Sequence, residues 1–436
     1  MVPLDLLKIR LPHIIIPIIL FSCISCKKPF SANLTGDAVN FLTVDGTIIS
    51  GDSTFITLGR TTGLKDTTQF KPELKAVVSV QNDQNVFYPL VEKGKGVYVL
   101  GVTNFDQART YRLNIKTTDG KIYQSDYVPM KITPPIDSVY FQQPDENTML
   151  FYVDTHDASN NTRYYRWDYK ETWEYIAILG GVDAYQYNAN NNTLIARNPP
   201  ISTTYCYGSA PSNEILIGSS ANLAKDIITK QQIGAIVGQS QKIERIYNME
   251  LHQYAITADA FKYYQNLKLN TEQLGSIFDA QPSTTNGNIH CITSPADLVT
   301  GFINVSTVTT RLLVLKYNDI PLRNVDYYFT NGFYYIGPPD FDECEAPDPN
   351  IFGGNGFGGI LLLEPAGTFN DRLAALVTGQ TVKFPILFNG LASSSVNGVI
   401  TPLGYTYIKR DCADCRVINH AGTSVSTIVP FGFKFF

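Results

Sequence analysis

The chain has 436 residues, of which 44% are hydrophobic and only 17% charged, and its formal net charge is −5. This length and apolar content suffice for two or three globular domains and exclude a disordered chain. The acidic balance, with no basic stripe along the sequence, excludes the usual nucleic-acid-binding proteins. The 26 tyrosines and 24 phenylalanines, together with many glycines and prolines, favour strands and turns over helices.

The first 25 residues are typical of an export signal peptide. A start carrying Lys8 and Arg10 leads into an apolar run at 11–21, too short to span a bilayer of about 30 Å but long enough for a signal sequence. A small residue directly before a cysteine then gives the arrangement that a lipoprotein signal peptidase needs. We expect Cys26 to carry a diacylglycerol/acyl (palmitate-type) anchor, with Cys23 as the alternative. The other interpretation is an ordinary signal peptide with a chance cysteine.

Residues 26–38 are predicted to be the lipid anchor and a polar tether. Over residues 39–133 the sequence offers about seven short strand-like runs separated by turn signals. One of these signals, Asp119-Gly120, suits a tight hairpin. Strict alternation of apolar and polar residues at 111–116 indicates a strand with one buried face. We therefore predict an immunoglobulin-like or transthyretin-like β-sandwich over 39–133.

Residues 134–436 are predicted to form a larger, antiparallel β-rich domain, introduced by two prolines. A single amphipathic helix is expected at about 257–269, because Thr257 is a suitable N-cap and Asp259 lies where the helix dipole favours a negative charge. At Asn270 and Thr271 the helix is expected to break or to restart as a short one. The apolar stripe that should pack on a sheet comprises Ala260, Phe261, Tyr264 and Leu267.

Five cysteines remain after removal of the leader and acylation of one cysteine. In an oxidising compartment disulfides are the default, and an odd number leaves at least one thiol free. The disulfide candidates are Cys344, Cys412 and Cys415: either Cys344 bonds to one of the other two, or those two bond to each other. Redox chemistry or zinc are the other interpretations of the Cys412-x-x-Cys415 motif, but no second such motif and no following histidine accompany it.

An aromatic run is the candidate binding surface, because rings with polar tips give large contact areas to carbohydrate or peptide. Strand alternation places half of these side chains in the core. The candidates are Tyr164, Tyr165, Trp167, Tyr169, Trp173 and Tyr175.

No catalytic, nucleotide-binding or cofactor motif of high specificity occurs in the sequence, so we expect a protein without cofactor that is not an enzyme. One acidic loop has carboxylates dense enough to hold calcium, although a solvated loop is the simpler interpretation. The weak calcium candidates are Asp340, Asp342, Glu343 and Glu345.

Several short motifs occur in a fixed order along nearly the whole mature chain. They are the lipid cysteine with Lys27-Lys28-Pro29-Phe30, Val44-Asp45-Gly46, Pro134-Pro135-Ile136-Asp137-Ser138-Val139, Tyr164-Tyr165-Arg166-Trp167, Ile277-Phe278-Asp279-Ala280-Gln281-Pro282, Gly287-Asn288-Ile289 and Cys412-x-x-Cys415. In this order they resemble the Bacteroidota lipoprotein family called "domain of unknown function 4249". The chain departs from that family's pattern at its end, Pro430-Phe431-Gly432-Phe433, and in the extra Cys23.

The resemblance implies a lipoprotein of the outer membrane, on either its periplasmic or its surface face, that accompanies a TonB-dependent receptor. We therefore expect a mainly β, lipid-anchored protein that acts by binding, beside such a transporter, in nutrient uptake. The alternatives from other classes are a surface hydrolase acting on glycan or peptide, and a structural or adhesion lipoprotein of the cell envelope.

Overall fold

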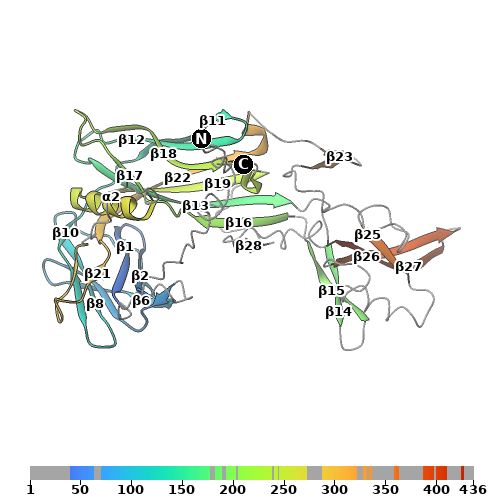
Figure 1. The fold of residues 1–436 in the computed structure, drawn as a ribbon, viewed down its shortest axis with the longest axis horizontal. Helices are drawn as coiled ribbons and strands as arrows, with labels where there is room; N and C mark the ends of the chain where they lie inside the picture. The colour runs from blue at the N-terminus through green and yellow to red at the C-terminus, as the bar shows by residue number, and fades with distance from the viewer. Residues whose placement is uncertain are drawn as a thin grey trace, which may run out of the picture.

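The computed structural model confirms a mainly β protein, with one α-helix among the residues it describes (Figure 1). The structure describes residues 40–62, 70–176, 182–188, 193–202, 205–237, 240–243, 245–272 and 287–321, and the strand segments 328–330, 333–335, 358–362, 386–396, 399–409 and 424–426.

The N-terminal unit is a sandwich of two sheets, as predicted. One sheet contains β1 (Leu42–Ser50), β2 (Thr54–Arg60), β7 (Val97–Leu100) and β6 (Val91–Gly94), with β3 (Lys71–Pro72) beside β2. The other contains β5 (Phe87–Pro89), β4 (Val77–Asn82), β8 (Thr110–Lys116) and β9 (Ile122–Ser125), with β10 (Val128–Pro129) beside β8. The alternation expected at 111–116 is present: Tyr111, Leu113 and Ile115 are buried in the core between the sheets. Each sheet therefore has one dry face.

A segment far along the chain completes this sandwich. β20 (Ile289–Cys291) pairs with β9, and β21 (Val299–Thr300) pairs with β1. Ile289 and Cys291 of β20 are buried in the core of the sandwich, and partly buried Val299 of β21 packs against that core. The predicted division into 39–133 and 134–436 is therefore wrong for this segment. The prediction assigned one contiguous stretch to each domain, whereas a later segment of the chain pairs with strands of the first domain.

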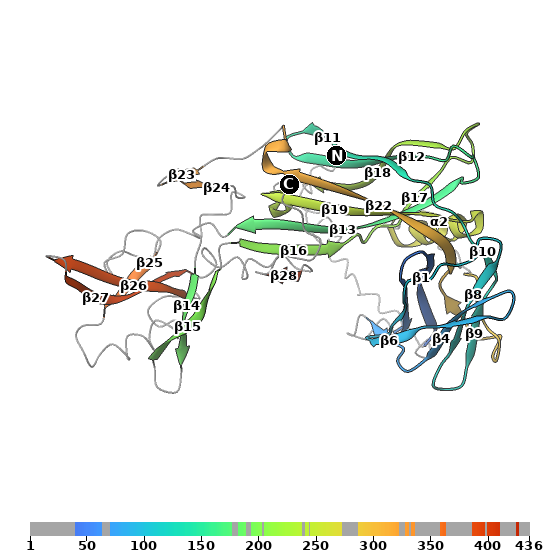
Figure 2. The same ribbon diagram turned by 180° about the vertical axis from the view of Figure 1, so that it is seen from behind.

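The second unit packs two sheets face to face (Figure 2). The longer sheet contains β28 (Ser424–Ser426), β16 (Tyr205–Pro211), β13 (Tyr164–Ile176), β19 (Ile246–Ala255) and β22 (Asn304–Lys316), with β17 (Leu216–Ser219) beside β13. The shorter contains β11 (Ile136–Asp145), β12 (Thr148–His156) and β18 (Ile227–Val237). The other elements are β14 (Val182–Asn188), β15 (Thr193–Ser202), η1 (Gln241–Ile243), η2 (Tyr317–Asp319), β23 (Tyr328–Thr330), β24 (Phe333–Tyr335), β25 (Gly358–Leu362), β26 (Ile386–Val396) and β27 (Val399–Lys409).

Strand β22 belongs to both units. Its first residues pair in parallel with the end of β1, and from Val308 onward it pairs antiparallel with β19, so one sheet runs through both units. Buried Thr133 forms hydrogen bonds at the place where the two units meet. Its Oγ1 accepts from the backbone N–H of Ala255 (3.0 Å), and its own N–H donates to Thr307 Oγ1 (2.8 Å). The two units are thus joined by a strand ladder, which is stiffer than a linker.

The helix α2 (Ala258–Glu272) begins where the sequence predicts. Thr257 Oγ1 accepts from the N–H of Ala260 at 3.2 Å, which is the expected N-cap bond. The helix continues past Asn270, so the predicted break is wrong. The reason is tertiary: the carboxylate of Glu272 accepts from the N–H of Ile215 (2.6 Å) and lies 3.5 Å from Lys268 Nζ, which holds the last turn in place.

Candidate functional site

The aromatic run on β13 is a core feature. Tyr165, Trp167, Trp173 and Tyr175 are each at most 4% exposed and fill the space between the two sheets of the second unit. Trp167 stacks on Tyr165 with ring centroids 5.7 Å apart, and its Nε1–H donates to Gln253 Oε1 at 2.8 Å. The predicted binding surface is therefore wrong for these four side chains.

The two remaining aromatic candidates do not form a surface either. Tyr164, on the opposite face of β13, is half-buried and packs against Phe261 of α2 with ring centroids 5.1 Å apart. Tyr169 is half-buried against the main core of the second unit. Strand alternation explains why most of these rings are in the core. Five of the six candidates have odd residue numbers, and odd-numbered side chains of one strand point to the same face of the sheet.

The face of β13 that α2 covers carries a compact charged cluster. Asp168 Oδ1 lies 2.9 Å from His252 Nδ1, and Asp168 Oδ2 lies 3.6 Å from an Arg166 guanidinium nitrogen. The Arg166 guanidinium also lies over the rings of Tyr264 (5.1 Å) and Tyr254 (5.6 Å). Because Tyr264 belongs to α2 and the others to the sheet, this cluster attaches the helix to the sheet.

The charge of His252 depends on Asp168. Partial burial lowers the pKa of His252, but the hydrogen bond and negative charge of Asp168 outweigh burial and raise it above its ordinary value of 6.5. The stabilisation that protonated His252 contributes is therefore fully present below about pH 6.5 and is lost as the pH rises through the raised pKa.

We expect Asp168→Asn to lower the pKa of His252, and this pH-dependent part of the stability to shrink with it, because the charge that favours the imidazolium is removed. NMR titration of the His252 ring measures the pKa directly. Asp137→Asn is the control: Asp137 raises the pKa of exposed His156 in the same way, so this variant should leave His252 unchanged. An unaltered His252 titration in Asp168→Asn would contradict the assignment.

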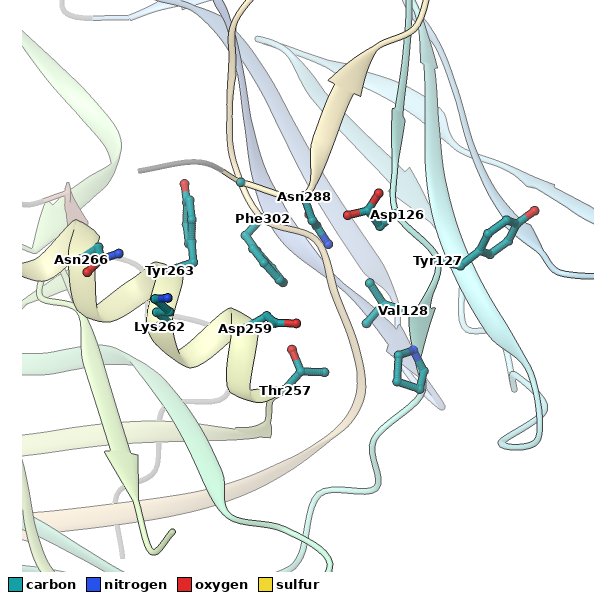
Figure 3. A pocket seen from close by; sticks show the side chains of 12 residues that line it. Asp126, Tyr127, Val128, Thr257, Asp259, Lys262, Tyr263, Asn266, Asn288 and Phe302 are labelled. Carbon is teal, nitrogen blue, oxygen red and sulfur yellow. The ribbon is translucent and has the colours of Figure 1, made fainter. Parts of the chain in front are cut away.

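A cleft of about 580 Å³ lies at the junction of the two units (Figure 3). Three stretches that are distant in sequence meet there: the end of β9 with β10, the first turns of α2, and the returning segment at 287–302. The cleft is lined by Asp126, Tyr127, Val128, Pro129, Thr257, Asp259, Lys262, Tyr263, Asn266, Gly287, Asn288 and Phe302. Its volume falls in the range of small-ligand sites.

The polar groups of the cleft approach from two sides. Asp259, on α2, and Asp126, before β10, face the gap from opposite walls, whereas the Tyr127 ring points away from it (Figure 3). Lys262 is the one cation in the described lining. Asp126 also lies 3.4 Å from exposed His290. The lining combines carboxylates, amides and rings, a set that suits a polar ligand with several hydrogen-bond donors.

The returning segment at 287–302, which forms one wall of the cleft, is held in place by contacts with the backbone. Asn288 imitates a strand residue: its Nδ2 donates to Ile303 O (2.9 Å), and the N–H of Ile303 donates to its Oδ1 (2.8 Å). A Cβ on Gly287 would lie 1.7 Å from Gly301 O, so only glycine permits this approach. The Gly287-Asn288-Ile289 motif noted in the sequence thus shapes the cleft, although the motif alone did not reveal which strands it joins.

The other predicted site residues fall outside the described part of the chain. These are the lipidation candidates Cys23 and Cys26, the disulfide candidates Cys344, Cys412 and Cys415, and the calcium candidates Asp340, Asp342, Glu343 and Glu345. Among described cysteines, Cys206 is buried and disulfide-bonded, and Cys291 is buried with a free thiol. Sequence reasoning did not single out Cys206.

The described residues form neither a cluster of metal-ligating side chains nor a membrane-spanning helix. No three or more His, Cys, Asp or Glu side chains there are grouped so that they could hold a metal ion. None of the helices described has the length and apolar character needed to cross a membrane.

Comparison with protein families identifies the chain. A sequence profile described as "Domain of unknown function (DUF4249)" matches residues 27–311, more than half of the chain. The chain belongs to the DUF4249 family. All cleft-lining residues of this DUF4249 chain lie within the matched range. The match begins at Lys27, directly after Cys26.

Comparisons with other known proteins add little to the family assignment. No curated protein matches the chain. Among solved structures, a two-domain fibronectin type-III segment from chicken tenascin matches at 9% identity, with 63% of this chain and 97% of that chain covered and a TM-score of 0.16. Chitinase ChiA74 from Bacillus thuringiensis matches at 10% identity, with 48% and 28% covered and a TM-score of 0.14. Scores this low carry no argument about fold or function.

Proposed function

We propose that this DUF4249 protein is a lipid-anchored binding protein of the outer membrane that works beside a TonB-dependent transporter in nutrient uptake. The observation that carries the binding role is the junction cleft, which has the volume of a small-ligand site and polar groups on opposite walls. The transporter partnership rests on the family resemblance in the sequence.

The ligand class follows from the lining. Two carboxylates and a single lysine in the described lining favour a neutral or cationic ligand over an anion, and the amide of Asn266 can both donate and accept hydrogen bonds. The ring of Phe302 supplies an apolar surface beside them. A polyhydroxylated or amide-rich nutrient has this mixture of groups.

The membrane placement rests on the leader. The signal-like residues 1–25 end at a cysteine preceded by serine, and the family match starts at the next residue. In cells supplied with a clickable fatty acid we expect the wild-type protein and Cys23→Ser to be labelled and Cys26→Ser to be unlabelled. A wild-type protein that takes up no label would remove the anchor from the proposal.

Uptake measurements test the role of the cleft. In a strain lacking the gene we expect wild-type protein to restore uptake of the nutrient carried by the co-purifying TonB-dependent transporter, and Asn266→Trp, which fills the cleft, to fail. Gln265→Trp is the matched control, because Gln265 is exposed on the same helix and does not line the cleft. Equal uptake by the two tryptophan variants would exclude the cleft as the site at which the nutrient binds. Substrate turnover by the purified protein would favour a hydrolase instead.

A further inference from the structure

The chain enters the fold at one end of the N-terminal sandwich. The carbonyl of Asn40 accepts from an Arg60 guanidinium nitrogen (3.3 Å), and the same side chain forms an ion pair with Glu73 (2.6 Å) and reaches the Tyr123 hydroxyl (3.5 Å). The start of β1, the end of β2, β3 and the start of β9 therefore meet here. We call this end of the sandwich the tether pole.

Other turns gather at the tether pole. Val77, at the start of β4, pairs with Lys116 at the end of β8, directly before the β8–β9 turn. The N–H of Lys75 donates to Glu92 of β6 (2.8 Å), and the N–H of Ile292 donates to Ile122 O (2.9 Å). Segments from five separate stretches of the chain thus end on one surface.

This surface exposes large apolar side chains. They are 43–69% exposed, although they lie beside well-formed strands, and a monomeric soluble surface rarely groups several such residues. The exposed apolar residues of the tether pole are Phe70, Leu74, Val77, Ile292 and Leu298.

The same surface is basic, in contrast to the acidic chain as a whole. Among the carboxylates that the structure describes there, Glu73 is paired with Arg60, and Asp297 lies 2.5 Å from Lys121 Nζ. The two other described carboxylates, Glu92 and Asp119, are outnumbered by the lysines. The lysines of the tether pole are Lys71, Lys75, Lys93, Lys95, Lys116 and Lys121. The pole therefore carries a local positive charge, whereas the precursor has a formal net charge of −5.

The tether keeps this pole close to its anchor. Thirteen residues separate Cys26 from Asn40, and even a fully extended chain of that length spans at most about 45 Å. The second unit is attached at the other end of β1, where Ser50 pairs with Thr307. In Figure 2, β10 faces the second unit and β6 lies away from it.

We infer that the tether pole docks on the anionic headgroups of a phospholipid leaflet. Its lysines face the lipid phosphates, and its exposed apolar side chains enter the headgroup region, as in other interfacial proteins. This inference deepens the proposed lipid anchoring, on which it rests for the orientation of the pole. Docking would direct the junction cleft away from the bilayer, toward a partner protein.

Vesicle binding by the mature chain from Lys27, which lacks an acyl group, tests the surface without the anchor. We expect sedimentation with vesicles of phosphatidylcholine and phosphatidylglycerol, weakened by salt, and little with phosphatidylcholine alone. Each lysine close to an anionic surface contributes about fivefold in affinity. The triple variant Lys71→Gln, Lys93→Gln, Lys116→Gln should therefore bind about a hundredfold more weakly. The control Lys170→Gln, Lys225→Gln, Lys316→Gln removes the same charge from exposed sites on the second unit.

Tryptophan fluorescence tests insertion. Leu298→Trp should shift to shorter wavelength on the anionic vesicles, and Val237→Trp, exposed on the second unit, should not. Equal losses in the two lysine variants, or no binding by the folded wild-type chain, would overturn the docking surface even if fatty-acid labelling succeeds. Selective binding without fatty-acid labelling in cells would support the surface and overturn the anchor.

Discussion

Replacing Trp167 by alanine should lower the free energy of unfolding by about 3–5 kcal/mol, the usual cost of removing a large aromatic side chain from a core. Trp167 is among the largest fully buried side chains described, and it belongs to the core that residues of both sheets of the second unit form. Its loss also leaves the buried Oε1 of Gln253 without the indole donor. Urea unfolding followed by circular dichroism measures the change, which should appear as a lower midpoint concentration of urea with an unchanged m-value.

Phe55→Ala is the control for this prediction. Phe55 is more than half exposed on the N-terminal sandwich, so its removal should change the free energy of unfolding by about 0.5 kcal/mol at most. If Trp167→Ala proved as mild as Phe55→Ala, Trp167 would not be a core residue and the aromatic run would again be a candidate binding surface.

Gly301→Ala should destabilise the protein by about 3 kcal/mol and distort the junction cleft. Gly301 has φ +147°, a conformation that other residues rarely adopt, and an added Cβ would lie 2.2 Å from Val44 O. Because the obstacle is backbone of β1, the contact can be relieved only by moving the returning segment away from the sandwich. Thermal unfolding and hydrogen exchange at Ile289 and Cys291 measure the two consequences.

Gly101→Ala is the matched control, since nothing lies within 4 Å of the added Cβ and its φ is unexceptional. It should be neutral or slightly stabilising, because alanine restricts the unfolded chain more than glycine does. Faster exchange at Ile289 in both variants, or in neither, would contradict the role assigned to Gly301.

Local sequence patterns were sufficient for much of the fold. The alternation at 111–116 placed Tyr111, Leu113 and Ile115 on the buried face of β8, and the N-cap at Thr257 located the start of α2. Both depend on neighbouring residues alone, because side-chain direction along a strand and capping of a first turn are local properties. The end of α2 was missed because Glu272 bonds to Ile215, more than fifty residues away.

The aromatic run shows how a composition argument fails. Rings suit binding and cores equally well, so residue type could not decide between them. The odd numbering of Tyr165, Trp167, Tyr169, Trp173 and Tyr175 did predict one shared face. Which face lies inward was decided by β11, β12 and β18, whose packing on that side is a long-range event.

The sequence by itself determined that this is a mainly β protein with a sandwich near its start and one capped helix, because alternation and capping act over a few residues. Only the tertiary structure decided that 287–307 returns to complete the sandwich, that β22 joins the two units, and that Asp126, Asp259 and Asn288 meet at one cleft. Such contacts depend on register and close backbone approach between strands far apart in the chain. The pattern of apolar residues within one strand predicts which of its faces is buried, but it does not predict which strand pairs with it.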